Sequence, residues 1–349
     1  MKPGVLLIRA DASLAIGTGH VMRCLALAQA WQDAGGTASL AAAELPNALS
    51  PRLTAEGVSP SRVHAAPGGP EDAAETVAQA RRLRADWVVI DGDRFGSDFL
   101  ETVRAAGLRV LLIDDFASRE AFPADLIVNP NLDDSLDDHE EPYRKQGASA
   151  RLLTGPSYVL LRREFRQGNE NERREIRQTG SRILVTLGGS DPENLTPKIA
   201  GALARSSDLE VTVIAGAGYD KVNELRKLNA SNLRVVCNPP NMAQFMQDSD
   251  QAIIAAGGTL WELLSMGCAV LSYSRTIVQA RVVHVLSNRG VVVDLGETRH
   301  FDPAKLTVSV IELAGSRLAR ERMTTVGHML VDGQGAARVV EVMQRAGAH

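Results

Sequence analysis

A histidine stands where a glycine-containing loop is expected to pass into a helix. The run Ile16-Gly17-Thr18-Gly19-His20 follows the apolar run 5–8 and precedes a helical pattern. Gly17 and Gly19 let the backbone approach a substrate anion, which free N–H groups at a helix N-terminus attract. The same dipole disfavours an imidazolium, so we expect His20 to be a neutral catalytic base. The alternative is a cap or packing role for His20.

Two charged residues flank this loop. Asp11 follows the expected strand, and it either caps the turn or orients a substrate amide or hydroxyl, because a carboxylate accepts hydrogen bonds in both roles. Arg23 lies one helical turn beyond His20 and either faces the same site or is solvated. Both residues are candidates for substrate binding.

A second glycine turn lies in the other half of the chain. The residues Gly188, Gly189, Ser190 and Asp191 follow an apolar strand pattern and precede Pro192, which suits the first turn of a helix. Two glycines and a serine offer backbone donors and a hydroxyl to a diphosphate. We therefore predict that these four residues bind the nucleotide, with a plain tight turn as the alternative.

A third turn repeats this arrangement further along. Gly257, Gly258 and Thr259 stand at another strand-to-helix junction, and Glu262 follows one turn into the expected helix. A carboxylate in that position can accept hydrogen bonds from both hydroxyls of a ribose. Glu262 is thus the ribose candidate, and its alternative is a favourable charge near a helix start.

Several other site classes lack their motifs. The glycine runs match neither the Walker pattern nor the dinucleotide fingerprint, and the chain has no G-x-S-x-G and no H-E-x-x-H. Its three cysteines are far apart, with no metal-ligand spacing. We predict no metal and no cofactor. The net charge of -4 and 4% aromatic residues also argue against a nucleic-acid partner.

The elements that position these residues follow an α/β rhythm. Short runs rich in Val, Ile and Leu alternate with helical patterns, which predicts parallel sheets covered on both faces. The clearest runs are 5–8, 87–90, 110–113, 183–187, 211–214, 233–236, 251–254 and 269–272. We predict two doubly wound Rossmann-like domains, 1–172 and 173–349, with a central cleft and a charged connector between them. The amphipathic stretch 335–343 predicts a last helix, which we expect to cross back to the first domain.

The start of the chain is too short and too soon charged for a signal peptide, and no run is long enough for a membrane span. The cytoplasm is therefore the expected location.

Seven runs of the chain, in order, resemble one family. They are 9–13 (RADAS), 16–25 (IGTGHVMRCL), 114–115 (DD), 125–130 (DLIVNP), 155–165 (GPSYVLLRREF), 185–191 (VTLGGSD) and 257–262 (GGTLWE). The family is the UDP-2,4-diacetamido-2,4,6-trideoxy-β-L-altropyranose hydrolases of pseudaminic acid biosynthesis, with the related spore-coat polysaccharide proteins.

The resemblance implies a GT-B architecture similar to that of the peptidoglycan N-acetylglucosaminyltransferase. It also implies that the C-terminal domain holds UDP, and that metal-independent attack by water, with inversion, releases UDP from a UDP-sugar substrate. The histidine of the matching G-x-G-H motif is His20, as the proposed base. The matched runs add Asn129, Tyr158 and Arg162 as candidates for substrate binding.

One segment departs from the family pattern. Where relatives carry Asp-His-Tyr, an acid and Trp-Glu, this chain has 91–100 (DGDRFGSDFL). Asp91 is kept and stays a candidate for substrate binding, whereas the histidine and tyrosine are missing. This departure leaves open a different acetamido sugar, or an acceptor other than water. A glycosyltransferase and a non-catalytic nucleotide-sugar-binding protein are the competing functions.

Overall fold

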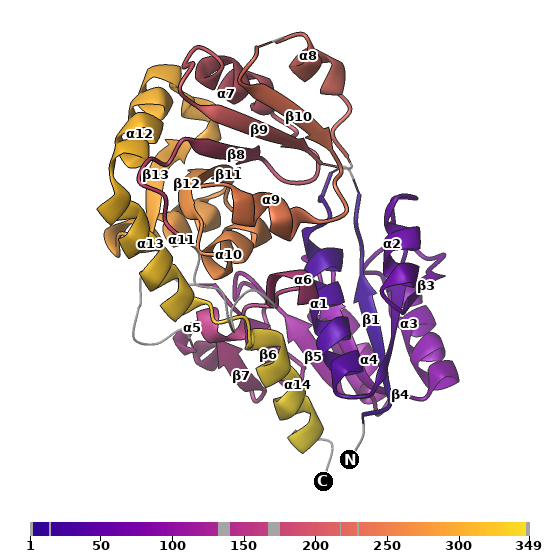
Figure 1. Cartoon of the computed structure of the whole chain (residues 1–349). Helices are drawn as coiled ribbons and strands as arrows, with labels where there is room; N and C mark the ends of the chain where they lie inside the picture. Colours follow the sequence, from indigo (N-terminus) through magenta and orange to yellow (C-terminus); the bar gives the residue numbers. More distant parts are fainter. Residues whose placement is uncertain are drawn as a thin grey trace. The chain divides into compact units, whose positions relative to one another are not determined.

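The chain divides into two compact units (Figure 1). A computed structural model describes residues 3–13, 15–131, 140–166, 175–216, 218–228 and 230–346. Unit 1 comprises Met1–Arg163 and Gln334–His349, and unit 2 comprises Glu164–Gly333. The predicted boundary at 172 and 173 lies outside the described residues, and the compact units change earlier, between Arg163 and Glu164.

Unit 1 is built on a parallel sheet of seven strands in the order β3-β2-β1-β4-β5-β6-β7. The strands are β1 (Val5–Ala10), β2 (Thr37–Ala42), β3 (Val58–Arg62), β4 (Ala85–Asp91), β5 (Val110–Ile113), β6 (Leu126–Asn129) and β7 (Arg151–Thr154). The helices are α1 (Gly19–Asp33), α2 (Leu49–Ala55), α3 (Pro70–Leu83), α4 (Ser97–Ala105), α5 (Glu141–Lys145), the short η1 (Pro156–Tyr158) and α14 (Gly335–Ala346).

Both faces of this sheet are covered, which explains its continuous apolar strands. On β1, Leu6 and Ile8 pack in one core cluster with Leu25 of α1. Leu7 points to the opposite face, where its cluster includes Leu100 of α4. Alternate side chains of a strand point to opposite faces, so a strand between two helical layers needs apolar residues at every position.

The last helix returns to unit 1. Val339, Val340 and Met343 of α14 lie in the same core cluster as α1. Gly335, the first residue of α14, lies against the backbone of Val159. A Cβ on Gly335 would lie 2.2 Å from the carbonyl oxygen of Val159. Residues 334–349 therefore belong structurally to unit 1.

Unit 2 repeats the plan with a parallel sheet in the order β10-β9-β8-β11-β12-β13. Its strands are β8 (Arg182–Thr186), β9 (Glu210–Ala215), β10 (Leu233–Cys237), β11 (Gln251–Ala255), β12 (Ala269–Ser274) and β13 (Val292–Glu297). Its helices are α7 (Thr196–Leu203), α8 (Val222–Arg226), α9 (Met242–Asp248), α10 (Gly258–Ser265), α11 (Ile277–Asn288), η2 (Thr298–His300), α12 (Pro303–Gly315) and α13 (Arg317–Leu330), while α6 (Arg163–Arg166) spans the change of unit.

Each sheet has one point at which the strand order reverses. In unit 1 the chain moves outward from β1 to β3 and then resumes on the other side at β4. In unit 2 the corresponding step is from β8 to β11. Open α/β sheets bind ligands at the carboxyl ends of the strands beside such a point. The prediction of two doubly wound parallel sheets is confirmed.

Within the described ranges, no helix is long and apolar enough to cross a bilayer.

Candidate functional site

His20 and Asp91 meet at the reversal point of unit 1. His20 is the second residue of α1, and Asp91 ends the neighbouring strand β4. The His20 Nδ1 atom lies 2.7 Å from Oδ1 of Asp91, whose side chain is fully buried, while 21% of the His20 side chain is exposed. An ionised carboxylate only accepts hydrogen bonds, so Nδ1 carries the hydrogen and Nε2 holds the free lone pair.

Arg23 completes the environment of this carboxylate. Its Nε donates to Asp91 Oδ2 over 2.7 Å and its Nη2 to Oδ1 over 2.6 Å, which makes a bidentate pair. Cys24 Sγ donates to Asp91 Oδ2 over 3.4 Å. The third Arg23 nitrogen, Nη1, donates to Oδ1 of Asp115 over 2.8 Å, and Asn131 Nδ2 donates to the same Asp115 oxygen. One guanidinium therefore links the carboxyl ends of β4 and β5.

The charges of Arg23, Asp91 and Asp115 shift the pKa values at this site. The carboxylate of Asp91 is the largest influence on His20 and raises the pKa of the imidazole, although burial opposes this. Burial tends to raise the pKa of Asp91, but the Arg23 and His20 charges together hold it well below its ordinary value. The pKa of Asp115 is also lowered, because the pairing with Arg23 outweighs burial. Two carboxylates and one guanidinium leave a net negative charge that a proton on His20 neutralises.

This result corrects one expectation from the sequence. The N-terminus of α1 was expected to disfavour the His20 imidazolium, yet the pKa of His20 is raised. A full negative charge in hydrogen-bond contact outweighs the partial charge of a helix end. The pair retains the geometry of a general base: Asp91 orients the ring and stabilises the imidazolium that forms when Nε2 accepts a proton.

The loop before His20 leaves space around its glycines. Gly17 has φ +76°, a left-handed conformation that favours glycine, and exchanges backbone hydrogen bonds with Ser13. No described heavy atom lies within 4 Å of a Cβ placed on Gly17 or Gly19. Thr18 makes no side-chain cap, and α1 has no acidic residue in its first turn. The loop is therefore shaped to let another molecule approach the start of the helix.

Asp11 and Asp91 do not face outward as substrate ligands would. Asp11 is buried, and its Oδ1 accepts hydrogen bonds from Arg9 and from the backbone N–H groups of Ala43 and Glu44. The Oδ1 atom of Asp11 thus holds a turn, as in the alternative role, and contact of Asp11 with substrate stays a prediction. Asp91 has no exposed surface and acts through His20 and Arg23. Arg23 likewise uses its guanidinium to position these carboxylates.

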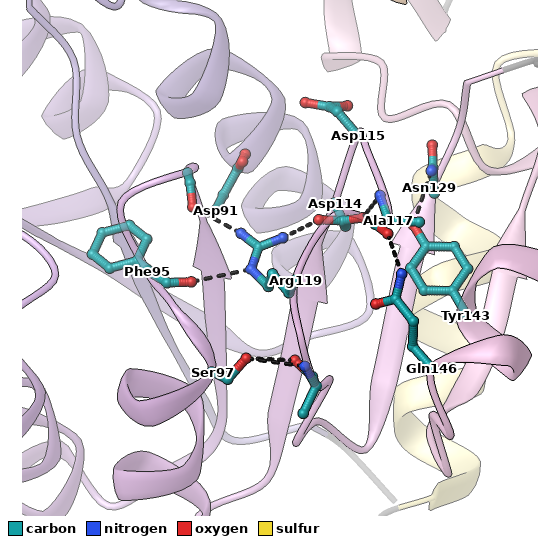
Figure 2. A network of polar contacts seen from close by, with 12 residues as sticks. Asp91, Phe95, Ser97, Asp114, Asp115, Ala117, Arg119, Asn129, Tyr143 and Gln146 are labelled. Carbon is teal, nitrogen blue, oxygen red and sulfur yellow. Dashed lines mark hydrogen bonds and ion pairs between the residues drawn. The ribbon is translucent and has the colours of Figure 1, made fainter.

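A second polar network lies beside the first at the carboxyl ends of β4, β5 and β6 (Figure 2). Asn129 Nδ2 donates to the Tyr143 hydroxyl over 2.9 Å, and that hydroxyl donates to Asp114 Oδ2 over 2.7 Å. Asp114 also pairs with Arg119. Figure 2 shows Asp115 projecting away from these partners. Asn129 is therefore held by neighbours within the unit.

The same network secures the segment that departs from the family pattern. Arg119 donates from Nη2 to the carbonyl oxygen of Gly92 over 3.0 Å and from Nε to that of Phe95 over 3.1 Å. The Phe95 ring is buried and lies 4.7 Å from the Arg9 guanidinium. Sequence reasoning missed Arg119 and Tyr143, because a lone arginine in a loop and a lone tyrosine carry no motif.

Most of the surface of Tyr158 and of Arg162 is covered. The Tyr158 ring packs against the core cluster that contains α14. Arg162 is buried, with 6% of its surface exposed. Their contact with substrate stays a prediction.

In unit 2, the first glycine turn follows β8. Gly188 has φ +86°, and no described heavy atom lies within 4 Å of a Cβ placed there. Gly188 is exposed, while Gly189 and Ser190 are half-buried. Asp191 turns inward instead: its Oδ2 accepts hydrogen bonds from the backbone N–H and the hydroxyl of Thr196, at the start of α7. Asp191 thus fixes the turn through Oδ2, and its role in binding UDP stays a prediction.

The second glycine turn of unit 2 leads into α10. Gly257 and Gly258 are exposed, and no described heavy atom lies within 4 Å of a Cβ placed on either. No side chain caps this end of α10, and its first turn has no acid. Thr259 and Glu262 are half-buried on the same helix. The predicted residues therefore lie at the carboxyl end of β11, where α10 begins without a side-chain cap.

Sequence reasoning missed the arginine at this edge. Arg275 follows β12, and its Nη2 donates to the carbonyl oxygen of Leu187 over 3.0 Å. The same nitrogen lies 3.4 Å from Asp191 Oδ1. Nothing around residue 275 resembles a motif, so only the strand order reveals that Arg275 reaches the first glycine turn.

Among the described ranges, no group of three or more His, Cys, Asp or Glu residues is arranged to hold a metal ion.

Curated relatives confirm the family resemblance. The chain is 26% identical over 263 residues to the UDP-2,4-diacetamido-2,4,6-trideoxy-β-L-altropyranose hydrolase of Campylobacter jejuni, covering 74% of this chain and 87% of that protein. It is 26% identical over 201 residues to the spore coat polysaccharide biosynthesis protein SpsG of Bacillus subtilis, covering 56% of this chain and 59% of SpsG. The uncharacterized protein MJ1062 of Methanocaldococcus jannaschii is 25% identical over 268 residues, which are 75% of this chain and 54% of MJ1062. The chain thus spans little more than half the length of two of these relatives. No protein-family model matches it.

Solved structures confirm the GT-B fold. Acinetobacter baumannii MurG aligns with a TM-score of 0.65 and 18% identity, covering 98% of this chain and 99% of MurG. The spinosyn forosaminyltransferase SpnP aligns with a TM-score of 0.68 and 13% identity, covering 100% of both chains. At these identities the likeness shows the fold alone.

Proposed function

We propose that this chain is an enzyme that hydrolyses a UDP-linked acetamido-deoxy sugar to UDP and the free sugar. The observation that carries the proposal is the His20–Asp91 pair, in which a buried carboxylate 2.7 Å from Nδ1 leaves Nε2 as the basic atom of the ring. The relative named as a UDP-2,4-diacetamido-2,4,6-trideoxy-β-L-altropyranose hydrolase supports the substrate class.

The proposed step begins with a water molecule beside Nε2 of His20. His20 takes a proton from this water as its oxygen forms a bond to the anomeric carbon of the sugar. The bond between that carbon and the phosphate oxygen breaks, and UDP leaves with the bonding electrons. The proton stays on His20, where Asp91 stabilises the imidazolium. Attack opposite the leaving group inverts the anomeric centre, and the step requires no metal ion.

We assign UDP to the open glycine turns of unit 2. Backbone N–H groups at Gly188, Gly189, Gly257 and Gly258, with the nearby hydroxyls, suit the diphosphate. Glu262 keeps its role as acceptor for the ribose hydroxyls. The sugar is assigned to the loop of Gly17 and Gly19 in unit 1.

A glycosyltransferase that moves the same sugar is the second candidate. A base at Nε2 serves an acceptor hydroxyl as well as it serves water, and GT-B transferases share the fold. The segment 91–100 supports the transferase as a second candidate, because it lacks the histidine and the tyrosine of the hydrolase pattern.

A substrate panel separates these functions. The purified protein is incubated with UDP-2,4-diacetamido-2,4,6-trideoxy-β-L-altrose and UDP-N-acetylglucosamine, with and without a chelator, while NMR follows UDP and free sugar. We expect release of free sugar without an added acceptor, and the same rate with the chelator. Turnover that requires an added acceptor would favour a transferase, and no release of free sugar from either compound would contradict the proposed hydrolysis.

A further inference from the structure

We propose that Arg275 is the cation that binds the diphosphate of the nucleotide. This inference rests on the proposed function and adds to it a residue that no motif of the chain marks. It follows from the position of the guanidinium, from the donors that it leaves unused, and from the charge around it.

The position follows from the strand order of unit 2. Arg275 comes directly after β12, whereas its acceptor Leu187 comes directly after β8. The strand β11 lies between these two strands. Neighbouring strands are about 4.8 Å apart, so the side chain has to cross the end of β11 to make this bond. Both glycine turns of unit 2 begin at β8 and β11, and the guanidinium thus lies at the reversal point between them.

The donors of Arg275 are incompletely used. Nη2 alone makes both of its contacts, to the Leu187 carbonyl and to Asp191. Nε is buried and has no hydrogen-bond acceptor among the described residues. A buried donor without an acceptor costs free energy, which a bound anion would recover. The Nε donor therefore remains for a phosphate oxygen, which suits a guanidinium in charge and geometry.

The positive charge is only partly balanced. Asp191 lies 3.4 Å from Nη2, a long contact, and its other oxygen is held by Thr196. The Arg275 side chain keeps 22% of its surface exposed. Arg275 therefore offers charge to a ligand, and Asp191 acts as the positioning residue that holds it. In the proposed reaction this charge stabilises the departing diphosphate.

The test compares UDP with uridine, which lacks the phosphates. Binding of each compound is measured by thermal shift and calorimetry for wild type, Arg275→Gln and Arg275→Lys. We expect Arg275→Gln to weaken UDP binding about 10- to 100-fold, the range for a hydrogen bond to a charged group, and to leave uridine binding unchanged. Arg275→Lys keeps the charge without the fork, so we expect a smaller loss.

Arg299→Gln is the matched control, because this arginine of the same unit is 69% exposed and pairs only locally, with Glu297. The melting temperature of each variant without ligand reports whether the turn has loosened. Unchanged UDP affinity in Arg275→Gln would overturn the proposal, as would equal losses for UDP and uridine, which would indicate a structural role. Failure of wild type to bind UDP would instead overturn the proposed function itself.

Discussion

The two sheets carry opposite kinds of polar site at the same topological position. At the reversal point of unit 1, both oxygens of Asp91 accept hydrogen bonds, and the guanidinium of Arg23 pairs with the carboxylates of Asp91 and Asp115. At the reversal point of unit 2, exposed glycines follow β8 and β11, and the buried Nε of Arg275 has no acceptor among the described residues. A fully paired network controls where a proton resides, whereas an open turn with an arginine accommodates an anion. The fold is repeated, and our proposal gives each copy a different part of the chemistry.

The largest expected effect comes from removing the base in unit 1. We predict that His20→Ala lowers kcat by about 10²- to 10⁴-fold, the usual contribution of a general base, while UDP affinity stays unchanged. Release of UDP and calorimetric binding of UDP measure these two quantities. His64→Ala is the control, because His64 is an exposed histidine of the same unit. Full activity of His20→Ala would remove the assigned role of unit 1.

Asp91→Asn tests the network behind the base. Arg23 would lose its bidentate partner, the fully buried carboxylate of Asp91, and we predict a loss of about 3–5 kcal/mol in the free energy of unfolding, measured with urea. Without the carboxylate the pKa of His20 falls. The acidic limb of the kcat/KM profile should therefore move to lower pH, since the base stays deprotonated there. Asp115→Asn leaves the bidentate pair intact and serves as the milder comparison. If the acidic limb of the kcat/KM profile stayed at the same pH in Asp91→Asn, the proposed influence of Asp91 on His20 would be contradicted.

Gly216→Ala tests the turn in unit 2. A Cβ on Gly216 would lie 2.5 Å from the carbonyl oxygens of Gly188 and Gly189, which are backbone atoms. The first glycine turn must shift, so we predict weaker UDP binding and a stability loss of about 1–3 kcal/mol. In Gly201→Ala the nearest atom is a flexible Leu228 methyl at 3.7 Å, and we expect little change. Equal UDP affinity in both variants would show that this turn does not hold the nucleotide.

The smallest expected effect is the pH dependence of stability. The pKa of His20 is raised above its ordinary value of 6.5, so its contribution is fully present below that pH and is lost as pH rises through the raised value. The lowered pKa of Asp91 contributes above its ordinary value of 3.8 and is lost on acidification. Urea unfolding of His20→Gln should lack the decline on the alkaline side. A decline as large as that of wild type would assign it to another group.

The sequence predicted the elements better than the partners. The run 5–8 reads as a buried strand because both of its faces meet helices, and 335–343 reads as a helix because one face meets a core. His20 was found through its glycine loop. The pairing of His20 with Asp91 joins residues far apart in the chain, and local spacing does not encode it.

The prediction from sequence was wrong about the direction of the His20 pKa shift. The helix end suggested a neutral His20, but a contact from β4 reverses the direction of the pKa shift. The sequence also did not predict the roles of Arg119, Tyr143 and Arg275. Each of them bonds to a residue that is distant in the sequence, so no local motif marks it. Asp11 and Asp191 were predicted as ligands because they follow strands, and in each of them one carboxylate oxygen accepts a backbone N–H instead of facing outward.

The most direct test of water attack from unit 1 is the fate of the solvent oxygen. UDP-2,4-diacetamido-2,4,6-trideoxy-β-L-altrose is turned over in water enriched in oxygen-18, and both products are analysed by mass spectrometry. Activation of water at the anomeric carbon by His20 predicts that the label enters the free sugar and that UDP carries none. Label in the phosphate of UDP would mean attack at phosphorus, and it would contradict the proposed role of the His20–Asp91 pair.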